Sequence, residues 1–351
     1  MEIPMLNKSV LSTLALLSFA ACNTDKETEN SRPIETISDS DMLRKFQSCD
    51  QLRTYVGDVA LNTILSHRYG YWGWGYDEAA ESDTADSGSG DSSSGPSDYT
   101  TTNVQEEGVD EIDMVKTDGQ FIYVAQDRTV QIVDSWPVED ASLVATVELS
   151  GWARGLFLQG DKLIVFETIS NEQSDVVDSW NGSRVTVINI ADRSAPVIER
   201  QIDIDGYLAD GRMVDGEVYL VLNHWLQLPY ELWDIAYDND IELPQVNWDL
   251  SGADLERNIA QARQQARHIL RPYVDVMVGN MDLEEILPSW RNQELGAADA
   301  DITLMHDCSD IYRPQEISQY NMLSLVHVDV ESNELNSTGL MANGWTIYAS
   351  Q

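Results

Sequence analysis

A turn that carries glycine recurs along the chain, and this repeat constrains the fold more than any other feature of the sequence. Its four copies read "TDGQFIYVA", "LQGDKLIVFE", "VDGEVYLVLN" and "ANGWTIYAS". Gly119 and Gly160 are 41 residues apart, whereas Gly160 and Gly216 are 56 apart, of which the polar stretch "SNEQSDVVDSWNGS" takes 14. The chain therefore repeats a unit of about 40 residues.

Within these units, short strand-like segments such as "TVQIVDSW", "KLIVFETI" and "RVTVINI" follow one another, with few helical patterns between them. Consecutive strands without intervening helices exclude a parallel α/β sheet. A period near 40 residues is that of a four-stranded blade. We therefore predict a mainly β fold, a β-propeller of antiparallel blades over residues 99–351. About three blades and the start of a fourth at Trp345 are present, and since a ring needs more blades, we expect this chain to be part of a longer protein.

The third spacing, from Gly216 to Gly344, is 128 residues and contains a non-strand insert at about 224–315. Within it, apolar residues recur at helical spacing from Leu255 to Tyr273, which predicts an amphipathic helix. Its outer face is expected to be basic, and two interpretations stay open, a surface that binds an anionic ligand and a lid whose arginines pair with nearby carboxylates. The arginines concerned are Arg257, Arg263, Arg267 and Arg271.

The first 22 residues carry Lys8 and then an apolar run from Val10 to Phe19, which is too short to span a bilayer. They predict an export signal that ends in "SFAAC", a sequence similar to a bacterial lipobox, with lipidation of Cys22. Ordinary cleavage after "SFA" or "FAA" is the alternative. We expect residues 23–40 to tether the protein to the envelope, as an outer-membrane, periplasm-facing or cell-surface lipoprotein.

Residues 41–76 are expected to form a short helix, in which Ser48 and Gln51 make a capping-box pattern, followed by the aromatic stretch "RYGYWGWGY". That stretch is interpreted either as a sugar-stacking surface or as an aromatic plug against the main domain. Residues 77–98 are rich in Asp, Ser and Gly and predict a flexible linker. With Cys22 lipidated, Cys49 and Cys308 remain as an expected disulfide or as two buried thiols.

The chain has 60 acidic and 21 basic residues, and its formal net charge is −39. Because this charge repels phosphate backbones, nucleic acid is excluded as a partner. The expected partners are a protein or a glycan, together with the membrane to which the lipid anchors the chain.

Four sequence stretches resemble one family of proteins. They are "TTNVQEEGVDEIDMVKTDGQFIYV" at residues 101–124, "DGYLADGRMVDGEVYLVLN" at 205–223, "CSDIYRPQ" at 308–315, and the final "GWTIYAS". They resemble bacterial and archaeal secreted proteins with a C-terminal beta-propeller domain distantly related to WD-repeats, from about Thr100 to the end. The resemblance implies a propeller, a domain longer than this chain and an extracytoplasmic location. It implies no common reaction or catalytic residues.

Hard oxygen ligands suited to calcium cluster before the first predicted strand, at Asp110, Glu111, Asp113 and Asp118. Their order does not match a twelve-residue calcium loop, and a turn at Asp118 and Gly119 also explains them. The stretch from Gln201 to Arg212 resembles such a loop but has Arg where the loop needs Glu. No cofactor is predicted, and calcium stays an alternative.

No catalytic motif is visible. The five histidines show no paired metal-ligand spacing, and "SGSGDSSSG" lies in low-complexity sequence rather than between a strand and a helix. We therefore predict a binding or scaffold protein without catalytic residues. The alternatives are a hydrolase of extracellular polymers, whose site lies in blades absent from this chain, and a calcium-dependent adhesion module.

Overall fold

The computed structural model describes residues 43–70, 109–177, 182–226, 228, 234–235, 241–298, 300–315, 321–330 and 334–344. The predicted signal with Cys22, the tether, the linker, the aromatic stretch after Gly70 and the strand that starts at Trp345 lie outside these residues. Within the described part, no helix is both long and apolar enough to cross a membrane.

The first blade is a four-stranded antiparallel sheet in which the strands follow one another in chain order. Gly119, with φ of +95°, forms the turn between its first two strands, a backbone conformation that glycine adopts without steric cost. The strands are β3 (Val115–Thr117), β4 (Phe121–Gln126), β5 (Thr129–Asp134) and β6 (Ser142–Glu148), with the short helix η1 (Val138–Asp140) before β6.

The second blade repeats this arrangement, with Gly160 at the first turn. Its strands are β7 (Trp152–Gln159), β8 (Lys162–Ile169), β9 (Gly182–Asn189) and β10 (Val197–Ile204). Two strands from later in the chain, β13 (Ser289–Glu294) and β14 (Thr303–Leu304), extend the sheet beyond β10.

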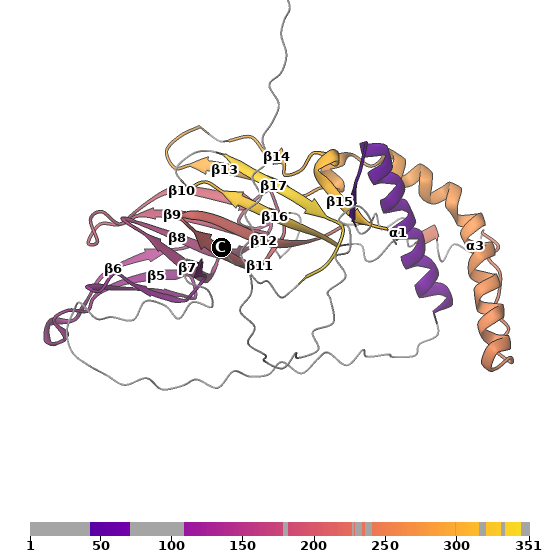
Figure 1. Cartoon of the computed structure of the whole chain (residues 1–351), viewed down its shortest axis with the longest axis horizontal. Helices are drawn as coiled ribbons and strands as arrows, with labels where there is room; N and C mark the ends of the chain where they lie inside the picture. Colours follow the sequence, from indigo (N-terminus) through magenta and orange to yellow (C-terminus); the bar gives the residue numbers. More distant parts are fainter. Residues whose placement is uncertain are drawn as a thin grey trace, which may run out of the picture. The chain divides into compact units, whose positions relative to one another are not determined.

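The third blade has Gly216 at the same turn and is built from strands on both sides of the insert. Its four strands are β11 (Tyr207–Val214), β12 (Glu217–Trp225), β16 (Asn321–Val328) and β17 (Leu335–Leu340). β2 (Val109–Glu111) pairs with β11, while β15 (Ile311–Pro314) and β1 (Leu43–Lys45) extend the sheet beyond β17. Three four-stranded antiparallel groups confirm the predicted fold class, and Figure 1 shows these sheets with both helices beyond one end of them.

Each blade packs through alternate side chains of its strands. In β8, Leu163 and Val165 belong to the core shared with blade 1, whereas Ile164 and Phe166 belong to the core shared with blade 3. The middle blade is therefore buried on both faces, which explains why "KLIVFETI" is almost continuously apolar.

The insert lies between Trp225 and Asn321, and the prediction that it lacks strands is wrong. It contributes β13, β14 and β15, which join the outer edges of blades 2 and 3. No residue of β13, "SWRNQE", is buried, so this strand lacks the apolar alternation by which sequence analysis finds strands.

A helical cap is built from α1 (Cys49–Tyr69), α3 (Gly252–Asn280) and the chain segment before α3. The Ser48 hydroxyl accepts a hydrogen bond from Gln51 N at 3.3 Å, as the capping pattern predicts. α1 and α3 pack along each other around their own apolar core (Figure 1). Cys49 and Cys308 form a disulfide, with Cα atoms 5.2 Å apart, and this bond links α1 to the insert.

Candidate functional site

The connections that carry the long loops lie at one end of the blades, because neighbouring strands are antiparallel. β7 and β9 begin at this end of blade 2, and β8 and β10 finish there. The β6–β7 link, the β8–β9 loop, the two-residue β10–β11 link and both ends of the insert therefore meet at this end. This end is where the chain has the most room to build a recognition surface.

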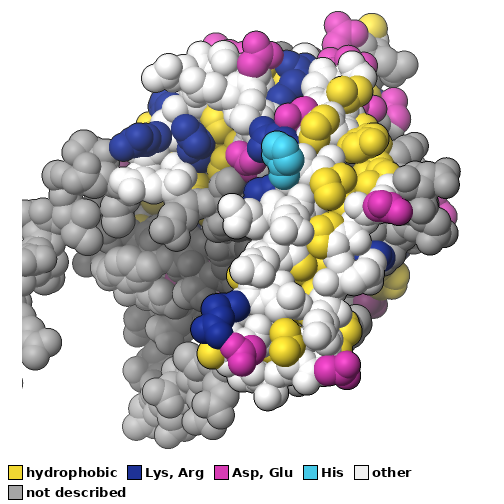
Figure 2. All heavy atoms as spheres, turned by 90° about the vertical axis from the view of Figure 1, so that its right-hand side faces the viewer, with side chains coloured by type: hydrophobic (Ala, Val, Ile, Leu, Met, Phe, Trp, Pro, Cys, Tyr) yellow, Lys and Arg dark blue, Asp and Glu magenta, His cyan; other side chains and the backbone are white. Residues whose placement is uncertain are grey.

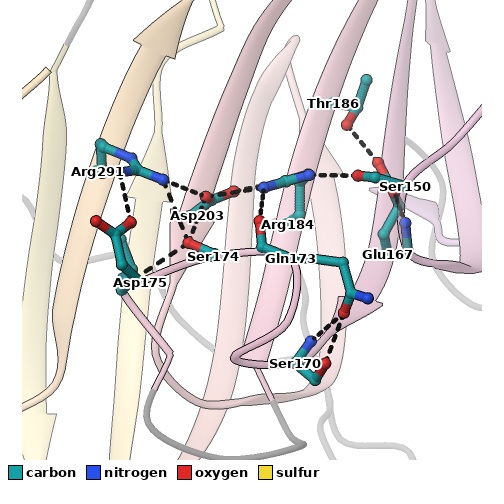
Figure 3. Close-up of polar contacts among 12 residues, drawn as sticks. Ser150, Glu167, Ser170, Gln173, Ser174, Asp175, Arg184, Thr186, Asp203 and Arg291 are labelled. Carbon is teal, nitrogen blue, oxygen red and sulfur yellow. Dashed lines mark hydrogen bonds and ion pairs between the residues drawn. The ribbon is translucent and has the colours of Figure 1, made fainter. Parts of the chain in front are cut away.

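A row of alternating charges crosses blade 2 at this end. Glu167 on β8 lies opposite Arg184 on β9, Arg184 lies opposite Asp203 on β10, and Asp203 lies opposite Arg291 on β13. We call these four residues the charge ladder (Figure 3). Cross-strand neighbours of opposite sign stabilise the pairing of their strands.

Asp203 is the centre of the charge ladder and is almost fully buried. Arg184 Nε and Nη2 donate to its two oxygens at 2.5 and 2.9 Å, and Arg291 Nη2 donates to Oδ2 at 3.1 Å. The Ser174 hydroxyl donates to the same Oδ2 at 2.6 Å. Burial alone raises the pKa of Asp203. The hydrogen bonds and the charge of Arg184, together with the hydrogen bonds from Ser174 and Arg291, outweigh burial and hold this pKa below its ordinary value.

Glu167 forms the β8 end of the charge ladder and is buried. Its carboxyl accepts hydrogen bonds from Gly151 N at 2.7 Å and from the Thr186 hydroxyl. Burial raises the pKa of Glu167, and the hydrogen bonds from Thr186 and Gly151 and the charge of Arg184 offset that rise only in part.

The charge ladder fixes three chain segments to blade 2. Glu167 holds the β6–β7 link through Gly151, and Arg184 reaches Ser150 in the same link. Asp203 holds the β8–β9 loop through Ser174 and holds the insert through Arg291, which also pairs with Asp175 of that loop at 2.6 Å. Because its acidic groups are buried and paired, the ladder positions the surrounding loops and presents no open reactive group.

Two histidines lie near the junction of blades 2 and 3. His224 Nδ1 is 3.0 Å from Asp205 Oδ2, a pair that fixes the orientation of the imidazole ring. His306 is buried between the hydroxyls of Ser324, 2.8 Å from Nε2, and Ser337, 2.9 Å from Nδ1. Burial, and then the charge of His224, lower the pKa of His306 to about 4, so its ring is neutral at pH 7 and serves the packing of the insert on blade 3.

The four arginines of α3 do not form the expected outward basic face. Arg263 donates to Ser66 at 3.1 Å, Arg267 bonds Asn62 and Arg271 pairs with Asp58, all on α1. Arg257 alone is largely exposed, and it pairs with Asp254 one turn earlier. The polar side of α3 packs against α1, because α1 supplies matching polar groups. The sequence of α3 alone does not reveal this, since α1 is far away in the chain.

The surface of the cap carries a pocket and exposed hydrophobic side chains. The pocket, of about 340 Å³, lies between the last turn of α1 and the segment before α3. Trp248, at 56% exposure, and Val276 and Tyr273 of α3 are exposed. Figure 2 shows the helical side of the molecule, where hydrophobic side chains form a broken band beside a group of Lys and Arg side chains. The pocket is lined by His67, Arg68, Tyr69, Pro244, Gln245, Val246 and Trp248.

Each acidic residue considered for calcium makes a contact of its own with other groups of the protein. Asp110 pairs with Lys116 at 2.7 Å, and Glu111 lies 3.5 Å from Arg212. Asp113 accepts a hydrogen bond from Met114 N, while Asp118 caps the glycine turn and bonds Tyr123. Among the residues that the structure describes, no group of three or more acidic, His or Cys side chains is arranged to hold a metal ion.

Sequence reasoning missed the charge ladder and the cap pocket. A signal for the ladder exists, since "FET", "SRV" and "IDI" each put one charge into an apolar strand. It becomes visible only after the strands of blade 2 are aligned in register. The pocket has no local signal, because its two sides are more than 170 residues apart.

Comparison with known proteins agrees with this architecture. The family model described as "Beta propeller domain" matches residues 99–351. An uncharacterised protein of Methanocaldococcus jannaschii is 28% identical over 213 residues, which make up 60% of this chain and 30% of that relative. No solved structure matches the chain. The family match and the three four-stranded blades together show that this chain belongs to the beta propeller domain family.

Proposed function

We propose that this protein is an extracytoplasmic, membrane-anchored binding protein that recognises a protein or a glycan through the helical cap. The observation that carries the proposal is the cap pocket, in which an exposed indole stands beside His67, Arg68 and Gln245. An exposed aromatic ring with polar groups around it is the composition of surfaces that bind sugars and proteins.

The way in which the cap is held supports a recognition role. α1 is joined to the insert by a disulfide, by the β1–β15 pairing and by the contacts of the α3 arginines. β13, in turn, joins the insert to blade 2. A rigidly mounted surface loses little conformational entropy when it binds a ligand.

The predicted export signal and the stretch "SFAAC", which is similar to a lipobox, support the proposed location. A lipid on Cys22 would hold the body at a membrane surface through residues 23–40. A disulfide between Cys49 and Cys308 suits an oxidising compartment outside the cytoplasm.

The test uses Trp248 with a matched control on blade 1, Trp136, which is exposed to a similar degree. The full exported protein is applied to an array of envelope glycans and to an array of extracytoplasmic peptides. We expect the wild type and Trp136→Ala to retain the same ligand and Trp248→Ala to lose it. If Trp248→Ala binds as the wild type does, or if the wild type binds neither array, the cap is not the recognition site.

A further inference from the structure

The three blades differ in whether another strand pairs with their outer strand. In blade 2, the outer strand β10 is covered by β13, and in blade 3 the outer strand β17 is covered by β15 and then by β1. In blade 1, β6 pairs with β5 on one side, and no strand of the described residues pairs with its other side. An uncovered edge strand is a template for another strand.

The hydrogen-bond pattern of β6 shows which backbone groups face outward. Leu149 directly follows β6, and Arg128 directly precedes β5. Leu149 N donates to Arg128 O at 2.8 Å, so these two residues continue the β5–β6 ladder as a hydrogen-bonded pair. Because such pairs alternate along antiparallel strands, the N–H and C=O groups of Thr146 and Glu148 point away from β5. These two residues therefore offer a donor and an acceptor each to an incoming strand.

A groove of about 620 Å³ runs beside this edge, between β6 and the start of β10. Its apolar lining is accessible, since Val197 and Leu295 are 59% and 45% exposed. The groove is lined by Ala145, Thr146, Val147, Glu148, Ser194, Pro196, Val197, Ile198 and Leu295. An added strand at β6 would place alternate side chains over this apolar lining.

Charge indicates what kind of strand fits. Glu148 lines the groove and is exposed, and the exposed Glu139 and Asp140 lie on the turn just before β6. The whole chain has a net charge of −39. A ligand strand with basic side chains alternating with apolar ones matches both the acidic edge and the apolar groove.

We propose that β6 binds an extended segment of a partner protein by strand addition, and that this segment alternates apolar and basic residues. The same architecture already accepts an added strand at the outer edges of blades 2 and 3. The β6 edge is on blade 1 and is separate from the cap pocket, so this binding is independent of the function proposed for the cap.

The test uses a capped heptapeptide that alternates Lys and Val and matches the seven residues of β6. Two control peptides are used, one in which Glu replaces Lys and one in which the central Val is Pro. With the full chain, we expect the Lys–Val peptide to slow hydrogen exchange at the Thr146 and Glu148 amides. Unchanged exchange at both amides in the presence of bound peptide overturns the proposal, as does equal binding of the proline peptide, which would indicate charge attraction alone.

A pair of variants at one position isolates the backbone contribution. Thr146→Pro removes an outward N–H from an edge strand, where proline is tolerated, whereas Thr146→Val keeps it. We expect Thr146→Pro to weaken peptide binding about tenfold and Thr146→Val to change it less than about twofold. Equal affinities of the two variants, when both melt as the wild type does, contradict strand addition. Trp248→Ala serves as a further control and should bind the peptide normally.

Discussion

Arg184 and Asp203 lie opposite each other on β9 and β10 and form a buried ion pair, with 2.5 Å between Nε and Oδ1. The pair sits between two further charges of the same row, Glu167 and Arg291. Its position at the loop-bearing end of blade 2 means that one carboxylate connects the blade, the β8–β9 loop and the insert.

We expect Asp203→Asn to lower the free energy of unfolding by about 3–5 kcal/mol, because it removes the carboxylate to which the buried guanidinium of Arg184 donates. Urea unfolding, with the disulfide intact, measures this change. The matched control is Asp161→Asn, which breaks the pair between Arg193 and a 64% exposed carboxylate and should cost less than about 1 kcal/mol. Similar losses in the two variants would show that the charge ladder is not a structural anchor.

The disulfide should hold α1 on the insert even when the chain between them is cut. A protease recognition sequence placed within residues 77–98 allows such a cut. After cleavage, we expect one band on a non-reducing gel and two on a reducing gel, whereas Cys308→Ser should give two bands on both. Two bands for the wild type without reductant would mean that Cys49 and Cys308 are not bonded in the protein.

Much of the blade architecture could be predicted from the sequence, because its signals are local. The turn glycines have positive φ in the structure, at Gly119, Gly160 and Gly216, and a few neighbouring residues suffice to reveal them. The alternation in "TVQIVDSW" and the capping pattern at Ser48 are equally local. These signals predicted four-stranded antiparallel blades, although the insert separates β12 from β16 in blade 3.

The cap and the ladder could not be predicted in the same way, because they depend on contacts between distant segments. Tyr273 continues the helical spacing of apolar residues, but it is exposed, whereas Leu270 and Val274 are buried. The reason is that α1 covers one side of α3, and the sequence of α3 alone does not fix which side this is. Likewise, Arg291 meets Asp203 only because β13 joins blade 2 after the helical insert.

Lipidation of Cys22 can be tested against another cysteine of the same chain. We expect cells that export the wild type and Cys49→Ser to incorporate labelled fatty acid into the protein and to retain it in the membrane fraction. Cys22→Ser should lack the label and leave the membrane fraction, because the acyl chains supply the membrane affinity. Label in Cys22→Ser, or a soluble wild type without label, would contradict the anchor.

Calcium should have little effect on stability. The carboxylates of Asp110 and Glu111 lie against Lys116 and Arg212, and Asp118 accepts hydrogen bonds from Phe121 N and the Tyr123 hydroxyl. A cation would have to displace these partners. We expect the melting temperature in millimolar calcium to equal that in chelator within about 1 °C, since only a ligand that binds the folded state raises it. A clearly higher melting temperature in calcium would instead support the hypothesis of a calcium-dependent adhesion module.

His306 should make stability depend on pH between about 4 and 6.5. Its pKa in the folded protein is about 4, below the ordinary value of 6.5, so in this window the unfolded chain binds the proton more tightly. Stability is therefore complete above pH 6.5 and falls as the pH is lowered, by about 1.4 kcal/mol per unit from this group. The nearby charges are those of His224 and Asp310, and both remain in His306→Gln. This variant should be less stable at pH 7, because it disturbs the contacts with Ser324 and Ser337, yet its stability should vary less between pH 6.5 and 4. Urea unfolding at several pH values measures both slopes, and parallel slopes would mean that His306 titrates normally.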